Sequence, residues 1–205
     1  FTMGLGDPEF SYRFLGITLQ NMGDSGRDVT ALKDYNYKRL GQWFFLLHQL
    51  DPLSDHIPMI AAYYFGGTLV PKDVAEVVNY LAVAGKIPAK DKWRWLAHAA
   101  FLARHRMNDM PLALKLAYEL AKLPGSAEMP QWARQMPAFI LSDAGDKEAS
   151  RKMMENMLVT EKNVHPAEIN FMKSYLIDQL GVDPKEVDAL MRMRAETPAD
   201  SQKAP

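Results

Sequence analysis

The 205-residue sequence contains no cysteine, and this absence excludes several kinds of chemistry at once. Without thiols there is no disulfide, no thiolate metal ligand and no cysteine nucleophile. Reducing and oxidising compartments both tolerate such a chain, so the localisation stays unknown. The sequence also has no run of about 18 apolar residues, and it therefore predicts no membrane-spanning helix within the chain.

An excess of charge of either sign is also missing. Lys and Arg number 24 against 25 Asp and Glu, giving a formal net charge of −1. No overall field favours nucleic acid or an anionic membrane, so we expect no nucleic-acid partner. Membrane association is expected only through a segment outside this chain.

The sequence lacks the familiar short enzyme motifs. It has no G-x-S-x-G, no Walker-type loop, no G-x-G-x-x-G after a strand and no S-x-x-K. Asp51 and Asp55 are the nearest approach to a carboxylate pair, and we interpret them as solvated loop residues between helices. We therefore expect the protein not to be an enzyme; an enzyme with an unrecognised site is the alternative from another function class.

No metal or cofactor site is predicted. His98 and His105 share one face of an expected helix, but two turns place them about 10 Å apart, too far to bind one ion. No H-E-x-x-H or clustered carboxylates accompany them. We interpret both as structural or surface histidines.

What is present is a large number of helix-start signals. Proline is tolerated at the first helical position, and two of the seven candidate prolines follow an Asp that can cap the helix: Pro8, Pro58, Pro71, Pro111, Pro130, Pro166 and Pro184. Together with apolar spacing they predict an all-α chain with helices over residues 8–22, 36–50, 57–66, 72–84, 90–106, 110–122, 130–143, 147–160, 166–180 and 184–195.

A two-helix unit recurs along the chain. Its first helices carry a large-x2-Leu/Ala-small pattern and recur about 35 to 46 residues apart, beginning at Tyr12, Pro58, Trp93 and Trp132. Such a unit cannot bury its apolar stripe alone, so neighbouring units are expected to stack into an α-solenoid of antiparallel helix pairs. We expect Trp93 and Trp132 to fill the spaces between pairs.

These units resemble the tetratricopeptide-repeat (TPR) family, whose first helix follows W-x2-L-G-x2-Y and whose second helix is followed by Pro. The resemblance covers roughly residues 8–160 and is carried by Leu15-Gly16 with Gly23-Asp24, by Leu50-Asp51-Pro52, by Leu123-Pro124 and by the turn from Ala144 to Ala149. The chain departs from the pattern in an inserted loop from Asp24 to Tyr35, in a longer turn from Arg104 to Asp109, and at Pro137 inside the fourth first helix.

The resemblance implies a TPR-like right-handed superhelix that binds a peptide or protein surface in a concave groove. Carrying the pattern over places these side chains along the groove: Arg13, Ile17, Gln20, Asn21, Met59, Tyr63, Gly66, Arg94, His98 and Phe101. Arg94 would clamp a carboxylate, an apolar side chain would stack on Tyr63 or Phe101, and Gly66-Gly67 would leave a gap.

The expected function is a non-catalytic scaffold or adaptor for protein–protein interaction. Its alternative is a structural subunit buried in a larger, membrane-associated or soluble assembly. Two groups of residues have an alternative interpretation. Tyr63 and Phe101 are equally expected as core residues between helix pairs. Arg104 to Arg106 are interpreted as cations that complement the helix dipole rather than as a patch that binds a partner.

The domain prediction is a single TPR-like helical-repeat domain over residues 7–195, with a flexible C-terminal tail over 196–205. Residues 1–6 are a separate N-terminal segment. We interpret it either as native sequence or as residues added for expression. Because the chain begins with Phe1 rather than Met, we expect a soluble domain trimmed from a longer chain, and a removed signal or anchor stays open.

Overall fold

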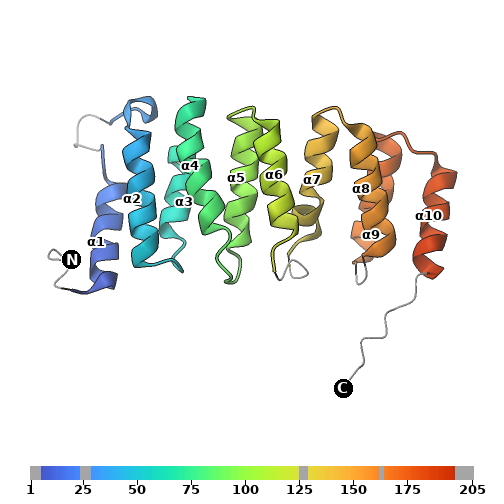
Figure 1. The fold of residues 1–205 in the computed structure, drawn as a ribbon, viewed down its shortest axis with the longest axis horizontal. Coiled ribbons are helices and arrows are strands. Elements are labelled where there is room, and N and C mark those ends of the chain that lie inside the picture. Colours follow the sequence, from blue (N-terminus) through green and yellow to red (C-terminus); the bar gives the residue numbers. More distant parts are fainter. Residues whose placement is uncertain (1–5, 24–28, 125–128, 162–163, 197–205) are drawn as a thin grey trace, which may run out of the picture. The chain divides into compact units, whose positions relative to one another are not determined.

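The described part of the chain is all-helical. The computed structural model describes residues 6–23, 29–124, 129–161 and 164–196 (Figure 1). Over these residues it has ten α-helices and no β-strand, as the sequence predicts. The predicted N-terminal segment and C-terminal tail lie outside them apart from Gly6 and Glu196, as do residues 24–28 of the predicted loop.

All ten predicted helices are confirmed. They are α1 Pro8–Gln20, α2 Tyr37–Leu50, α3 His56–Tyr63, α4 Pro71–Ala84, α5 Trp93–His105, α6 Met110–Ala121, α7 Gln131–Asp143, α8 Lys147–Thr160, α9 Pro166–Ser174 and α10 Pro184–Glu196. Short 3-10 turns occupy Leu32–Asp34 (η2) and Phe65–Gly67 (η3). The predicted helix over 166–180 ends at Ser174 and continues as a π-helical turn, Tyr175–Gln179 (η5).

Proline and aspartate mark the helix starts as predicted. The Asp7 carboxylate accepts hydrogen bonds from the backbone N–H groups of Glu9 (2.9 Å) and Phe10 (3.3 Å), which have no partner inside α1. The Asp183 carboxylate accepts one from Lys185 N–H at 2.8 Å at the start of α10. Three of the predicted prolines do not stand at the first helical position. Pro58 and Pro111 follow the first residues of α3 and α6, and Pro130 is the N-cap before α7.

The chain divides into two compact units, Phe1–Glu128 and Met129–Pro205, which we call the first and the second unit. In the first unit each helix contacts its neighbour in the sequence, and α2 also contacts α4, while α3 contacts both α1 and α5. The helices of this unit lie side by side with their axes roughly aligned (Figure 1).

Aromatic rings fill the core of the first unit. Phe44 of α2 packs against Phe65 of η3 and Tyr80 of α4, with ring centroids 5.6 and 5.1 Å apart. Between α4 and α5 the backbones approach closely, because a Cβ at Gly85 would overlap the backbone of Leu96. Glycine at this position therefore sets the spacing of the two helices.

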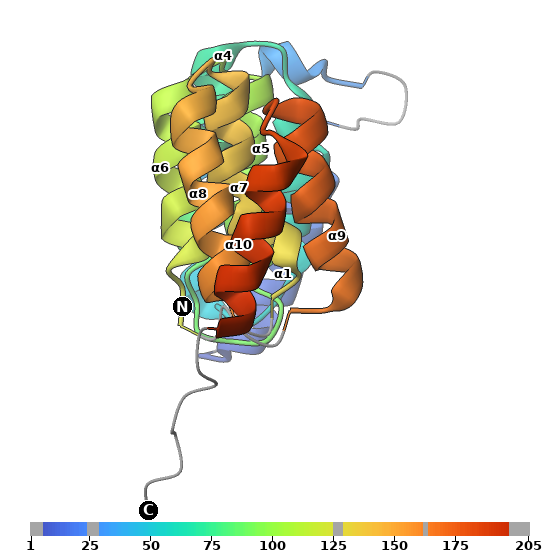
Figure 2. The same cartoon turned by 90° about the vertical axis from the view of Figure 1, so that its right-hand side faces the viewer.

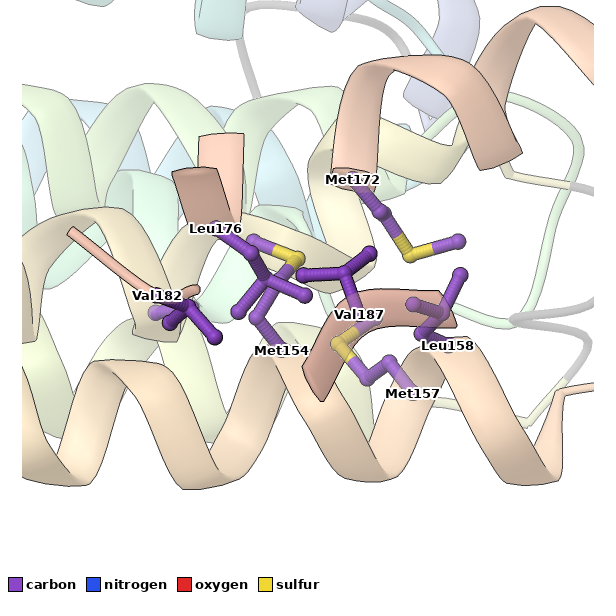
Figure 3. Close-up of a cluster of buried hydrophobic side chains, with 8 residues drawn as sticks. Met154, Met157, Leu158, Met172, Leu176, Val182 and Val187 are labelled. Atoms are coloured by element: carbon purple, nitrogen blue, oxygen red, sulfur yellow. The ribbon is translucent and has the colours of Figure 1, made fainter. Parts of the chain in front are cut away.

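The second unit has its own core, rich in methionine. α8 contacts α7, α9 and α10, and Figure 2 shows α10 between α8 and α9 in that view. Side chains from α8, α9, η5, the loop before α10 and α10 itself point toward one another in Figure 3: Met154, Met157, Leu158, Met172, Leu176, Val182 and Val187.

Two sequence predictions about packing are wrong. Trp93 and Trp132 were expected to fill the spaces between helix pairs, but Trp132 is 46% exposed and Trp93 is only half-buried. Trp95, which was not expected in the core, is 2% exposed and fills it. Gly66-Gly67 leaves no gap, because Gly66 is buried and a Cβ there would meet Leu102 Cδ1 at 3.2 Å. Both errors come from reading a helix face without knowing its neighbours.

Candidate functional site

A row of five aromatic and imidazole rings runs along α3 and α5 of the first unit. Tyr63, the last residue of α3, lies 6.2 Å from the ring of Trp95 and 5.1 Å from that of His98. Along α5, His98 and Phe101 are 5.8 Å apart and Phe101 and His105 are 4.5 Å apart, between ring centroids. We call these five residues the ring strip.

Helix geometry explains why the strip is continuous. His98, Phe101 and His105 follow the i, i+3, i+7 spacing, so their side chains lie one above the other on one face of α5. At 1.5 Å per residue the strip extends over about 15 Å from Trp95 to His105. Contact between α3 and α5 adds Tyr63 beside His98.

The strip has a buried base and exposed edges. Trp95 is 2% exposed, whereas Tyr63 is 68% and Phe101 49% exposed. The alternative reading of Tyr63 and Phe101 as core residues is therefore wrong. Large rings exposed over packed neighbours are held in place but still accessible to a partner.

The two imidazoles are favoured in their neutral form. Burial lowers the pKa of His98 below its ordinary value, and a hydrogen bond with the Ala62 backbone opposes this only in part. Burial and the neighbouring Arg104 charge lower the pKa of His105 as well. At neutral pH the strip therefore presents uncharged rings whose nitrogen atoms can still form hydrogen bonds.

Arg94 does not project as the carboxylate clamp that the resemblance implied. Its guanidinium is paired with the carboxylate of Asp55, directly before α3, and its Cζ lies 4.8 Å from the centre of the Trp95 ring. Asp55 also accepts a hydrogen bond from Trp95 Nε1 at 2.7 Å. The predicted clamp is thus satisfied within its own chain.

Lys92 completes this polar network at the start of α5. Only 3% exposed, it donates from Nζ to the Leu53 carbonyl (2.6 Å), the Ser54 carbonyl (2.9 Å) and Asp55 Oδ1 (2.7 Å). Burial opposes ionisation of Asp55, but the hydrogen bonds from Lys92 and Trp95 and the nearby cations lower its pKa overall. The interpretation of Asp55 as a simple solvated loop residue is therefore wrong: it fastens α3 to α5.

The remaining predicted groove residues lie on α1 and α3. Arg13 and Gln20 are exposed on α1, Asn21 is the exposed C-cap of α1, and Met59 of α3 is 46% exposed. The Arg13 side chain pairs with Glu9 of the same helix. Of the ten side chains that the resemblance places along the groove, the ring contacts join Tyr63, His98 and Phe101.

Two members of the strip were not predicted. Trp95 lies in the same sequence motif as the singled-out Trp93, and only the packed structure tells which of the two indoles turns inward. His105 was interpreted as a dipole-complementing or surface residue, although its spacing from His98 and Phe101 already placed it on their face. Helical spacing alone could have found His105.

Neither a metal cluster nor a membrane-spanning helix is found in the described part of the chain. Within the described ranges, no three His, Asp or Glu side chains are grouped so that they could hold an ion. The same part of the chain has no helix that combines the length and the hydrophobicity needed to cross a bilayer. Comparison with known proteins gives no match to a protein-family model, to a curated protein or to a solved structure.

Proposed function

We propose that the first unit binds a segment of another protein along the ring strip and that the protein acts as a non-catalytic interaction scaffold. The observation that carries this proposal is the exposure of Tyr63, which packs on the buried Trp95, and of Phe101, which packs between His98 and His105. Aromatic side chains that are held by neighbours and exposed at their edges are the residues from which binding hot spots are built.

Rigidity of the strip supports the proposal. Lys92, Arg94 and Trp95 of the α5 region all reach Asp55, so the starts of α3 and α5 are fastened together. Phe101 is flanked by an imidazole on each side, which restricts its ring. Binding then orders few additional side chains, and less of the contact energy is lost as conformational entropy.

The helix contacts support a TPR-like array as the underlying architecture. In the first unit α3 contacts the previous and the next first helix of a pair, α1 and α5, and α2 contacts α4. Stacking of this kind places first helices next to first helices, which is how repeat proteins form an extended binding surface. On the same ground we propose the solenoid of antiparallel helix pairs that the sequence predicts.

Lys92 is the group that most resembles a catalytic residue, but its contacts give little support to a catalytic role. Lys92 is a buried amine beside a carboxylate, the combination expected of a catalytic lysine. However, its three acceptors, the carbonyls of Leu53 and Ser54 and the carboxylate of Asp55, take up the three donors of an ammonium group. The network is satisfied internally, which supports a structural role.

Affinity capture with three matched baits tests the proposal. The baits are the unmodified protein, the strip variant Tyr63→Ser/Phe101→Ser, and the control Trp43→Ser/Leu46→Ser, which removes two exposed apolar side chains of α2. The proposal expects a partner retained by the unmodified protein and the control but lost from the strip variant, with unchanged helical content by circular dichroism. Equal retention by all three baits would overturn it.

A second candidate function is that of a subunit buried in a larger assembly. Trp43 and Leu46 favour it, because they are 38% and 44% exposed on α2, a helix that contributes no ring to the strip. Leu46 also borders a shallow depression of about 460 Å³ that Gln42 and Glu76 help to line. Loss of the partner from the Trp43→Ser/Leu46→Ser bait alone would support this function instead.

A further inference from the structure

We infer that a second copy of this chain docks on an exposed apolar face of α1 and that the protein forms a reversible dimer there. The face consists of Phe10, Phe14 and Ile17, which we call the α1 stripe. Since α1 contributes no ring to the ring strip, this inference is independent of the proposed function.

The α1 stripe is continuous and exposed. Phe10, Phe14 and Ile17 are 54%, 53% and 58% exposed, and the rings of Phe10 and Phe14 stack with their centroids 6.4 Å apart. Their i, i+4, i+7 spacing places them on one side of the helix. A shift of two positions turns a side chain by about 200° around a helix, so the buried residues of α1 lie on the opposite side: Tyr12, Gly16 and Leu19. α1 thus has two apolar faces, and its own unit buries only one of them.

The repeat pattern indicates which neighbour such a face contacts. The α1 segment from Tyr12 to Gly16 corresponds to the α5 segment from Trp93 to Ala97, because both have the large-x2-Leu-small pattern. In this alignment Phe14 of α1 takes the place that Trp95 has in α5. One turn later, Ile17 takes the place of His98.

In α5 these positions contact the first helix of the preceding pair. Trp95 and His98 lie 6.2 and 5.1 Å, between ring centroids, from Tyr63 of α3. The α1 stripe is the corresponding side of α1, which lies at the end of the first unit (Figure 1). Repeat units bury such faces by stacking helix against helix, so the occupant expected on the α1 stripe is another helix.

The charges of α1 favour a second copy as that occupant. Glu9 and Arg13 form an ion pair within α1, and the Asp7 carboxylate accepts hydrogen bonds from the first N–H groups of the helix. The α1 stripe itself contains no charged residue, so a strongly acidic or basic helix gains no charge pair on it. A two-fold axis places the same stripe on both sides of the interface, and aromatic and aliphatic side chains then pack against their own kind.

The size of the α1 stripe sets the strength of the dimer. A large side chain buries about 150 to 250 Å² when it is fully covered, so three half-exposed ones offer roughly 300 Å² per copy. Stable complexes bury about 800 Å² per partner. We therefore expect a weak, reversible dimer with a dissociation constant between about 10 µM and 1 mM.

Sedimentation velocity of the full chain tests the inference. The unmodified protein is compared with the stripe variant Phe10→Ser/Phe14→Ser and with the control Trp43→Ser/Leu46→Ser, which removes two exposed apolar side chains of α2. With rising concentration, the unmodified protein and the control should shift from monomer to dimer. The stripe variant should have a dissociation constant at least about tenfold higher. Its circular dichroism should stay unchanged, because both rings are exposed in the monomer.

Spin labels locate the interface in the dimer. Because the chain has no cysteine, a single cysteine in place of Thr18, one turn after Phe14, accepts one label per copy. Packed helices lie about 8 to 10 Å apart, so electron spin resonance should measure a label-to-label distance below roughly 30 Å. The same label at the exposed Lys72 of α4 should give a longer distance.

The possible results separate cleanly. A monomer at every concentration would overturn the inference and leave the α1 stripe to a helix of a different protein. A dimer that persists unchanged in Phe10→Ser/Phe14→Ser, or one whose Thr18 labels lie further apart than its Lys72 labels, would also overturn it. None of the variants changes Tyr63 or Phe101, so none of these results bears on the proposed function.

Discussion

At the scale of single residues, the Asp55–Lys92 pair shows how a buried charge is held. Removing a charge from water is costly, and the cost is offset only when the charge is fully hydrogen-bonded. Lys92 meets this condition through three acceptors, while Asp55 keeps contact with solvent, its side chain being 41% exposed. The two partners should therefore respond differently to substitution.

We predict that Asp55→Ala destabilises the protein more than Lys92→Met. Asp55→Ala leaves a buried ammonium without its counter-charge, a change that costs about 3 kcal/mol in other proteins. Lys92→Met keeps the volume and leaves Asp55 paired with Arg94, so about 1 to 2 kcal/mol is expected for the carbonyls that lose their donor. Urea unfolding of both variants measures the difference; a larger loss in Lys92→Met would contradict this account.

Buried tyrosines of the first unit make its stability sensitive to alkali. Burial raises the pKa of Tyr37 to about 12, despite an opposing hydrogen bond with Thr68, and burial raises that of Tyr80 further. The unfolded chain releases these protons near pH 10. The stabilisation is therefore fully present below pH 10 and is lost as the pH rises toward 12.

Replacing each tyrosine by phenylalanine separates the two hydroxyls. The Tyr80 hydroxyl is buried without a hydrogen-bond partner, whereas that of Tyr37 donates to the Phe65 carbonyl at 3.1 Å. We expect Tyr80→Phe to raise the unfolding free energy at pH 7 by about 1 kcal/mol and Tyr37→Phe to lower it by a similar amount. Both should reduce the loss of stability above pH 10, measured by thermal unfolding across the alkaline range. A stability that does not change between pH 9 and 11 in the unmodified protein would refute the argument.

Tryptophan burial provides a further comparison at this scale. We predict that Trp95→Ala costs about 3 to 5 kcal/mol, because Trp95 is almost completely buried, and that Trp132→Ala costs less than about 1 kcal/mol. Chemical denaturation of the two variants gives both values. Equal costs would show that Trp132 is packed more tightly than its 46% exposure indicates.

At the scale of helices, the starts of elements could be predicted from the sequence, and their contacts could not. Proline and aspartate act within the first turn, so Pro8 after Asp7 marks the start of α1 without reference to the rest of the chain. Which face of α5 is buried depends on α3, α4 and α6 around it. For this reason the sequence predicts burial of Trp93 and not of Trp95. It also predicts that Arg94 pairs with a partner's carboxylate, whereas Asp55 of the same chain pairs with it.

The contact between α4 and α5 is predicted to depend on Gly85. Gly85→Ala places a methyl group against the Leu96 backbone, so the two helices must move apart, at a cost of about 2 to 3 kcal/mol. Gly145→Ala is the matched control: it has open space, and its positive φ of 88° costs only about 1 kcal/mol. Melting temperatures of the two variants test the ranking, and a Gly85→Ala protein as stable as Gly145→Ala would exclude the close approach.

At the scale of the whole molecule, repeat spacing was the most useful sequence signal for the fold. A pattern that returns about every 35 to 46 residues predicted helix pairs, and ten helices are present in the described chain. The ring strip was predictable only in part, since the sequence placed Tyr63, His98 and Phe101 on one surface and the ring contacts also include Trp95 and His105. Ring contacts across two helices depend on side-chain directions that a single-chain pattern does not contain.

The measurement that tests the ring strip most directly is site-specific photo-crosslinking in the source cell. The photoreactive residue p-benzoylphenylalanine replaces Phe101 of the strip in one strain and Trp43 of α2 in another, both being exposed aromatic positions. We predict a discrete crosslinked protein from position 101 and none from position 43. Crosslinks from position 43 with none from position 101 would contradict the assignment of the binding face to α3 and α5.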